Sequence, residues 1–159
     1  MTPENNIESK LAELGLELPV PSAPVANYVP FVRTGNLVLI SGQISKVGDE
    51  SVTGHLGRDL SIEQGQHAAR LSALNLLAQM KAAAGSLENV ARVVKLGGFV
   101  QCAPDADGAN IPRVINGASD LMVELFGERG RHARFAVSAP VLPLGVAVEI
   151  DAIVEIQVS

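Results

Sequence analysis

Two segments of the chain repeat apolar residues with the spacing of amphipathic helices. One runs from Ser61 to Gly85 and the other from about Ile111 to Phe126. Their apolar residues recur every three or four positions, which places them on one side of a helix. These residues are Ile62, Ala69, Ala73, Leu76, Leu77 and Met80 in the first segment, and Val114, Ile115, Ala118, Leu121, Met122 and Leu125 in the second. Ser61 with Gln64 fits a capping box, so the first helix is expected to begin there.

Alternating and apolar runs outside these helices predict strands. They lie on either side of the turn Thr34–Asn36 (the second of this pair being Leu37–Ile44), at Ala91–Cys102, Arg134–Ala139 and Val146–Val158, with a further short strand near Ser51–His55. The order is therefore ββ-α-β-α-ββ. Such an order is typical of an α+β sandwich, in which two helices cover one face of a mostly antiparallel, mixed sheet. The other face of that sheet would be uncovered in a monomer.

The alternation also predicts which side chains share a face. In the last strand, one face carries Val146, Val148, Ile150, Ala152, Val154 and Ile156, and we expect it under the helices. If the segment "PVLPLG" closes a hairpin, Arg134 lies opposite Asp151 and Ala136 lies opposite Glu149. Arg134 and Glu149 would then point together to the uncovered face.

The N-terminal part differs from the rest in its pattern. Residues Ile7–Leu14 predict a short amphipathic helix that ends at Gly15, and "LPVPSAPVAN" predicts an extended, proline-broken arm. We therefore divide the chain into an N-terminal helix and arm (1–27) and a main domain (28–159). The first ten residues do not resemble a signal peptide, and no apolar run approaches a membrane span. These patterns predict a soluble, cytoplasmic protein without a membrane partner.

Composition narrows the classes of function. Among the 159 residues, 47% are hydrophobic and 18% are charged, so an oligomer would supply further buried surface. The net charge of −5 and the 3% of aromatic residues argue against a dedicated nucleic-acid binder. The one local basic run is "GRHARFAV", Gly130–Val137. Cys102 has no partner for an intrachain disulfide, and His55 and His67 lack metal-ligand spacing, so no metal is expected.

Three segments, in this order and spacing, resemble the reactive intermediate deaminase family, also called RidA or YjgF. They are "NLVLISGQI" (36–44), "ARFAV" (133–137) and "VEIDAIVEI" (148–156). The segment "IPRVINGASDLMVELFGERGRHAR" resembles more specifically a branch labelled YjgF-like putative endoribonuclease. The resemblance covers about Tyr28 to the C-terminus. It implies a chorismate-mutase-like fold, a homotrimer with pockets between subunits, and hydrolysis of enamine or imine intermediates to 2-keto acids and ammonium without a cofactor.

The resemblance also implies site residues. It makes Arg134 the residue that binds the substrate carboxylate and Glu149 the second catalytic group. Ala136 stands where the family commonly has a cysteine, which puts the substrate range in question. The remaining substrate-binding residues that it implies are Tyr28, Ser41, Gly42 and Asn116. A planar guanidinium binds a carboxylate through two parallel hydrogen bonds, and a carboxylate in a partly closed pocket can accept and return protons.

The residues by themselves leave other interpretations open. Arg134 and Glu149 could form a cross-strand ion pair, while Tyr28 and Asn116 could be packing residues. Arg131 and His132 are more simply placed at a rim or an interface. Two other functions remain beside the deaminase: a trimer that binds keto acids without turnover, and an endoribonuclease that uses the basic run.

Overall fold

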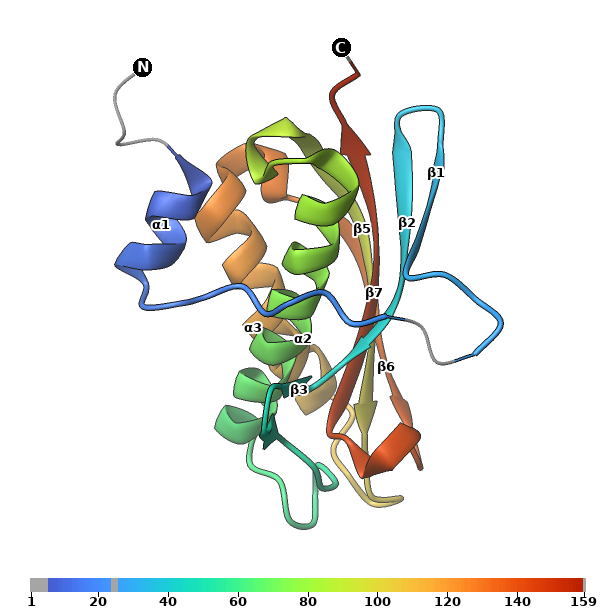
Figure 1. Cartoon of the computed structure of the whole chain (residues 1–159). Coiled ribbons are helices and arrows are strands. Elements are labelled where there is room, and N and C mark those ends of the chain that lie inside the picture. The colour runs from blue at the N-terminus through green and yellow to red at the C-terminus, as the bar shows by residue number, and fades with distance from the viewer. Residues whose placement is uncertain (1–5, 24–25, 159) are drawn as a thin grey trace.

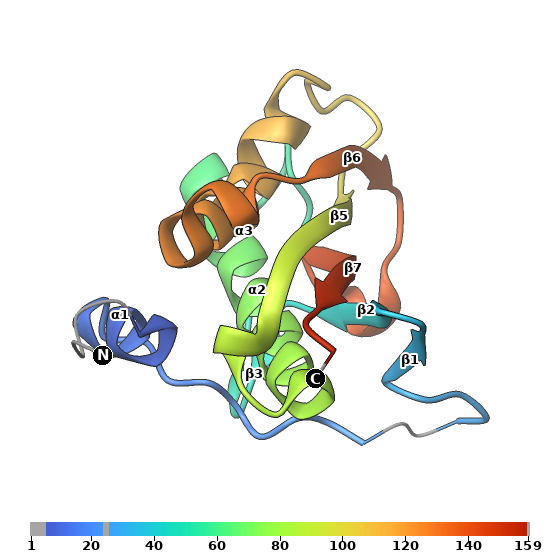
Figure 2. The same cartoon turned by 90° about the horizontal axis from the view of Figure 1, so that it is seen from above.

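The computed structural model describes residues 6–23 and 26–158. Residues 1–5, 24–25 and 159 lie outside this description; they are the start of the predicted N-terminal region, a part of the predicted arm and the last residue of the predicted main domain. The chain forms two layers, with the helices on one face of a five-stranded sheet (Figures 1 and 2). The elements are α1 (Ile7–Glu13), β1 (Phe31–Thr34), β2 (Leu37–Ile44), β3 (Lys46–Val47), β4 (Glu50–Ser51), α2 (Ile62–Ala84), β5 (Val90–Gln101), α3 (Asn110–Phe126), β6 (Ala133–Ala139) and β7 (Val148–Ile156). No helix in the described ranges is long and apolar enough to cross a membrane.

The predicted α+β class and element order are confirmed. The capping box that begins α2 is present: Gln64 N donates to Ser61 Oγ over 3.1 Å, and Ser61 N donates to Gln64 Oε1 over 2.8 Å. One short element differs from the prediction. The strand expected near Ser51–His55 is replaced by the small β3–β4 hairpin, after which Thr53 forms an isolated bridge to Val146.

The predicted hairpin between the last two strands is wrong. The sheet order is β1-β2-β7-β5-β6, so β5 lies between β6 and β7. Strand β6 runs parallel to β5, whereas the other pairs are antiparallel. The buried side chain of Gln101, at the end of β5, holds the connection across this strand: it accepts from Leu142 N (2.8 Å) and donates to Gly145 O (3.2 Å). The chain therefore wraps around the end of β5 instead of turning back on itself.

The two faces of the sheet differ in cover. Residues Val148, Ile150, Ala152, Val154 and Ile156 of β7 face the helices and are at most 3% exposed. They pack with the apolar sides of α2 and α3 in the core, as predicted. None of the helices in the described ranges lies over the opposite face (Figure 1). It carries large apolar side chains that are 37–53% exposed: Val32, Leu37, Leu39, Phe99, Phe135 and Val137.

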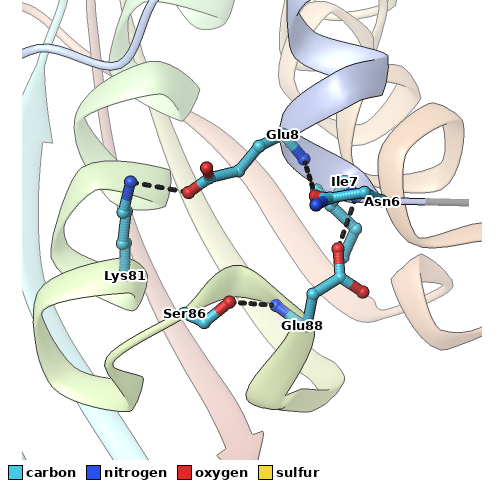
Figure 3. A network of polar contacts seen from close by, with 6 residues as sticks. All are labelled: Asn6, Ile7, Glu8, Lys81, Ser86 and Glu88. Atoms are coloured by element: carbon cyan, nitrogen blue, oxygen red, sulfur yellow. Dashed lines mark hydrogen bonds and ion pairs between the residues drawn. The ribbon is translucent and has the colours of Figure 1, made fainter. Parts of the chain in front are cut away.

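The N-terminal helix packs on the same core. Ile7 and Leu11 of α1 are buried in it. Glu88 accepts a hydrogen bond from the N–H of Ile7, and Lys81 of α2 pairs with Glu8 over 2.6 Å (Figure 3). Such an exposed ion pair contributes little stability, so the buried apolar residues hold α1 in place. The arm then runs along the helical layer, where Gln79 Nε2 of α2 donates to Ser22 O over 3.3 Å.

Candidate functional site

Most of the residues that the sequence singled out fall into two groups in the structure, and Ser119 joins one of them. One group surrounds the guanidinium of Arg134 and consists of Arg134, Asn116, Ser119 and His132; we call it the Arg134 cluster. The other surrounds the carboxyl group of Glu149 and consists of Glu149, Tyr28, Ser41 and Gly42; we call it the Glu149 pocket. The two groups are held by different elements and are described in turn.

Arg134 points to the face that the helices cover. Its Cα partner on β5 is Leu96, which is fully buried under the helices, and paired residues of adjacent strands point to the same side. Phe135, the next residue, points to the open face and is 37% exposed. The prediction that Arg134 points to the uncovered face is therefore wrong. Strand β6 therefore places the apolar Phe135 and Val137 on the open face and Arg134 under α3.

The guanidinium of Arg134 is held by three acceptors on α3. Its Nη1 donates to Asn116 Oδ1 (2.9 Å) and to Ser119 Oγ (3.0 Å), and its Nη2 donates to Pro112 O (3.3 Å). All three acceptors are neutral. Among the described residues, no carboxylate lies within ion-pair distance of Arg134. The side chain therefore keeps an uncompensated positive charge in a fixed orientation, an arrangement that suits an anionic ligand.

His132 and Ser119 extend this cluster. His132 Nε2 lies 2.8 Å from Ser119 Oγ, and Nδ1 lies 2.6 Å from Gly130 O. Partial burial lowers the pKa of His132 below its ordinary value; the hydrogen bond to Gly130 opposes this, and the charge of Arg134 adds to it. The ring is therefore neutral at physiological pH. Ser119 was not among the predicted site residues, although it stands three residues after Asn116 on the same side of α3.

A bulge in β2 shapes the Glu149 pocket. The pairing of β2 with β7 passes from Ile40↔Ala152 to Gln43↔Ile150, so two residues of β2, Ser41 and Gly42, stand against Asp151 alone. The bulge brings the backbone of Gly42 against Glu149. A Cβ at Gly42 would lie 3.1 Å from both Cδ and Oε1 of Glu149. Gly42 therefore leaves room for this carboxyl group in its present position.

Glu149 is half-buried on the open side of β7. Burial raises the pKa of its carboxyl group above the ordinary value, and the like charge of Asp151, two residues further along the same face, raises it further. A raised pKa increases the protonated fraction near neutral pH. This carboxyl group is therefore better able than an ordinary glutamate to accept and return a proton.

The other walls of the Glu149 pocket come from several elements: loops, β2, β3, α2 and the N-terminal arm. The cavity has a volume of about 680 Å³ and is also lined by Tyr28, Ser41 and Leu144. Ser41 Oγ donates to Val29 O over 2.8 Å, which ties the segment that carries Tyr28 to the bulge. Four residues of the N-terminal arm also line it: Pro19, Val20, Ser22 and Ala23. The predicted arm was not assigned to a site, because no local pattern shows where an extended segment lies.

The two groups do not meet within one chain. Arg134 and Glu149 stand on strands separated by β5, which is about 10 Å at the usual strand spacing. Glu149 pairs with Phe99, three positions along β5 from the partner of Arg134. The two side chains also point to opposite faces of the sheet. The structure thus joins Asn116 to Arg134, and Tyr28, Ser41 and Gly42 to Glu149, but not Arg134 to Glu149.

The remaining candidate residues lie outside both groups. Ala136 is on the same face as Arg134 and packs against the core. Cys102 is buried, and burial raises the pKa of its thiol, which leaves it unreactive. Arg131 pairs with Glu128 over 3.0 Å. In the part of the chain that the structure describes, no cluster of His, Cys, Asp or Glu side chains could hold a metal ion.

Comparison with known proteins agrees with this architecture. A family model described as "YjgF/chorismate_mutase-like, putative endoribonuclease" matches residues 8–156. Protein TCP17 of Trypanosoma cruzi is 47% identical over 95% of this chain and 94% of its own. The crystal structure of Atu1372 from Agrobacterium tumefaciens is 50% identical, with a TM-score of 0.88 over 95% of this chain and 92% of that one. A putative endoribonuclease from Shewanella oneidensis is 35% identical, with a TM-score of 0.90 over 96% and 100%.

A more distant solved structure contains a ligand. TdcF of Escherichia coli, crystallised with bound serine, is 25% identical, with a TM-score of 0.58 over 89% of this chain and 96% of that one. The family model and the similar structures together show that the fold is the YjgF/chorismate-mutase-like fold, with a mostly antiparallel sheet and its helices on one face.

Proposed function

The chain belongs to the YjgF/chorismate-mutase-like family, whose description reads putative endoribonuclease, and we propose that it binds small carboxylates at Arg134 and hydrolyses reactive enamines and imines to 2-keto acids. The proposed substrates are intermediates such as 2-aminoacrylate and its imine tautomer. The products are a 2-keto acid and ammonium, and no cofactor takes part.

The observation that carries this proposal is the state of Arg134. Three neutral acceptors on α3 fix its guanidinium, while Nε and one hydrogen of Nη2 have no partner among the described residues. Two N–H groups of one guanidinium form the fork that a carboxylate accepts bidentately. A half-buried arginine with neutral partners and two N–H groups without a partner among the described residues is better suited to a carboxylate ligand than to a structural ion pair.

Glu149 supplies the proton chemistry in this proposal. Water adds to the carbon of the protonated imine and loses a proton to the Glu149 carboxylate, and the carboxyl group returns this proton to the nitrogen. The C–N bond then breaks as the hydroxyl proton passes to the departing nitrogen, so that the protonated imine and water give the keto acid and ammonium. The raised pKa of Glu149 favours both transfers near neutral pH. Such intermediates also hydrolyse without an enzyme, so a small set of groups is sufficient.

A complete site needs two copies of the chain. Arg134 and Glu149 face opposite sides of the sheet in one chain, so one small molecule cannot contact both. The open face carries exposed Val32, Leu37, Leu39, Phe99, Phe135 and Val137. Monomers rarely expose such an apolar surface, which supports association through this face. We propose a homotrimer in which Arg134 of one copy and the Glu149 pocket of the next form each site.

The ligand class has support from a relative. TdcF of Escherichia coli, which shares the fold at 25% identity, was crystallised with bound serine, a small amino acid with a free carboxylate. Serine has the three-carbon skeleton of 2-aminoacrylate. An RNA substrate has less support, because "GRHAR" does not form a basic surface: Arg131 pairs with Glu128, while His132 and Arg134 bond to Ser119 of α3.

A coupled assay tests the proposal. A dehydratase that releases 2-aminoacrylate is mixed with the protein, and keto acid is followed with time. We expect faster formation with the wild type, and no acceleration with Arg134→Ala. An Arg134→Ala variant as active as the wild type would refute the proposal. Tight binding of 2-ketobutyrate without any acceleration would instead support a trimer that binds keto acids without turnover.

A further inference from the structure

His132 is the one polar side chain of the Arg134 cluster that the proposed function leaves without a role. Its Nδ1 lies 2.6 Å from Gly130 O, which can only accept, so Nδ1 carries the ring proton. Nε2 of the neutral ring is then an acceptor, and it lies 2.8 Å from Ser119 Oγ. The hydroxyl of Ser119 therefore donates to His132.

The direction of this hydrogen bond determines what Ser119 presents to Arg134. Since the hydroxyl hydrogen points to His132, the lone pairs of Ser119 Oγ are available to Arg134 Nη1 at 3.0 Å. Asn116 Oδ1 accepts from the same nitrogen at 2.9 Å. We propose that Ser119 and His132 are positioning residues that orient the guanidinium of Arg134 toward an incoming carboxylate, an inference that rests on the proposed role of Arg134.

A charged imidazole would not serve this purpose. If Nε2 were protonated it would donate to Ser119 Oγ, and the hydroxyl hydrogen would then need another acceptor. The second positive charge would also stand beside Arg134. Burial and the charge of Arg134 both lower the pKa of His132, which keeps the neutral form that the geometry requires.

Other charged side chains near His132 are engaged elsewhere. On its own segment, Arg131 pairs with Glu128, and Arg129 donates to Val90 O over 2.8 Å. On β5, Lys95 lies over the ring of Phe135, which is on the open face. The acidic residues of α3 near Ser119 line a groove against α2: Asp120 and Glu124. Among these charged groups, Arg134 is the one whose charge lowers the pKa of His132.

Titration with 2-ketobutyrate at pH 8 tests this arrangement. We expect Ser119→Ala and His132→Ala each to weaken binding about fivefold, the effect of about one hydrogen bond. The double variant should bind 2-ketobutyrate as tightly as the single variant with the lower affinity, because both substitutions act through the same contact. Ser119→Thr keeps the hydroxyl and should restore affinity. Ser138→Ala, on the same strand but exposed, is the matched control and should bind like the wild type.

Nitrogen NMR of the His132 ring provides a readout that needs no ligand. We expect the Nδ1–H tautomer in the wild type and a higher pKa of His132 in Arg134→Gln, because the neighbouring charge is removed. If the wild type binds 2-ketobutyrate through Arg134 while both single variants bind within twofold of it, the inference is overturned.

If the wild type binds no keto acid, the proposed ligand is wrong and the NMR experiment decides the inference alone. A pKa of His132 that rises in Arg134→Gln would support the coupling. An Nε2–H tautomer, or a pKa that does not respond to Arg134→Gln, would overturn it.

Discussion

Arg134 and Glu149 carry opposite charges and are held in opposite ways. Three neutral acceptors of α3 bind the guanidinium of Arg134, which stays charged and fixed in direction. The carboxyl group of Glu149 is half-buried beside Asp151, and both effects raise its pKa. The first environment suits recognition of an anion, and the second suits proton transfer. In the proposed function these two environments serve the two halves of one reaction, and a second copy of the chain would bring them together.

The largest effect is expected from removing the charge of Arg134. Arg134→Gln loses two charge-assisted hydrogen bonds to a carboxylate and should weaken 2-ketobutyrate binding about 100-fold. Arg131→Gln is the control, since Arg131 is exposed and pairs with Glu128, and it should bind like the wild type. Isothermal titration calorimetry measures both. Equal losses in the two variants would mean that the effect comes from overall charge and not from a site.

A second substitution disturbs the helix that holds Arg134. Gly117 of α3 passes so close to α2 that a Cβ would lie 2.2 Å from Gln66 O. Gly117→Ala should lower the free energy of unfolding by about 2 kcal/mol, as measured by urea denaturation. It should also weaken 2-ketobutyrate binding, because Asn116 and Ser119 move with α3.

The control for this substitution lies on the loop before α3. A Cβ at Gly108 would meet no atom within 4 Å, so Gly108→Ala should leave the free energy of unfolding unchanged. The pKa of Glu149 should be the same in both variants, because its surroundings come from β2 and β7. A shift of that pKa in Gly117→Ala would show that the two groups are not independent.

The smallest effect concerns how the stability of the folded protein changes with pH because of Glu149. The folded-state pKa of Glu149 is raised, so its contribution to stability is fully present below about pH 4.5, its ordinary pKa, and is lost as the pH rises through the folded value. Glu149→Gln removes this loss. The melting temperature of the variant should exceed that of the wild type by about 1–2 °C at pH 7.5, and the difference should vanish at pH 4. A lower melting temperature at pH 7.5 would contradict the assigned cause of the shift.

Sequence patterns predicted the elements better than they predicted their pairing. The helices were found because their apolar residues recur with helical spacing and because Ser61 and Gln64 form a capping box. The prediction of a hairpin between β6 and β7 was wrong, because nothing local in "PVLPLG" shows that Gln101, about forty residues earlier, holds this connection across β5. Parallel pairing of β5 and β6 is equally non-local.

The predicted direction of the Arg134 side chain was wrong for a related reason. The alternation in β6 was taken to put its polar side on the uncovered face, but there β6 carries Phe135 and Val137. Asn116 was identified by resemblance, whereas Ser119 and His132 became part of the cluster only when α3 and β6 were seen together. The arm residues of the Glu149 pocket depend in the same way on where an extended segment crosses the fold.

Mixing two inactive variants tests the shared site most directly. Arg134→Gln and Glu149→Gln are unfolded and refolded together in equal amounts, and hydrolysis of dehydratase-generated 2-aminoacrylate is measured. If each site takes Arg134 from one copy and Glu149 from another, random assembly restores about a quarter of the wild-type activity. Each variant refolded alone should stay inactive. A mixture no more active than the separate variants, while refolded wild type is fully active, would contradict a site shared between copies.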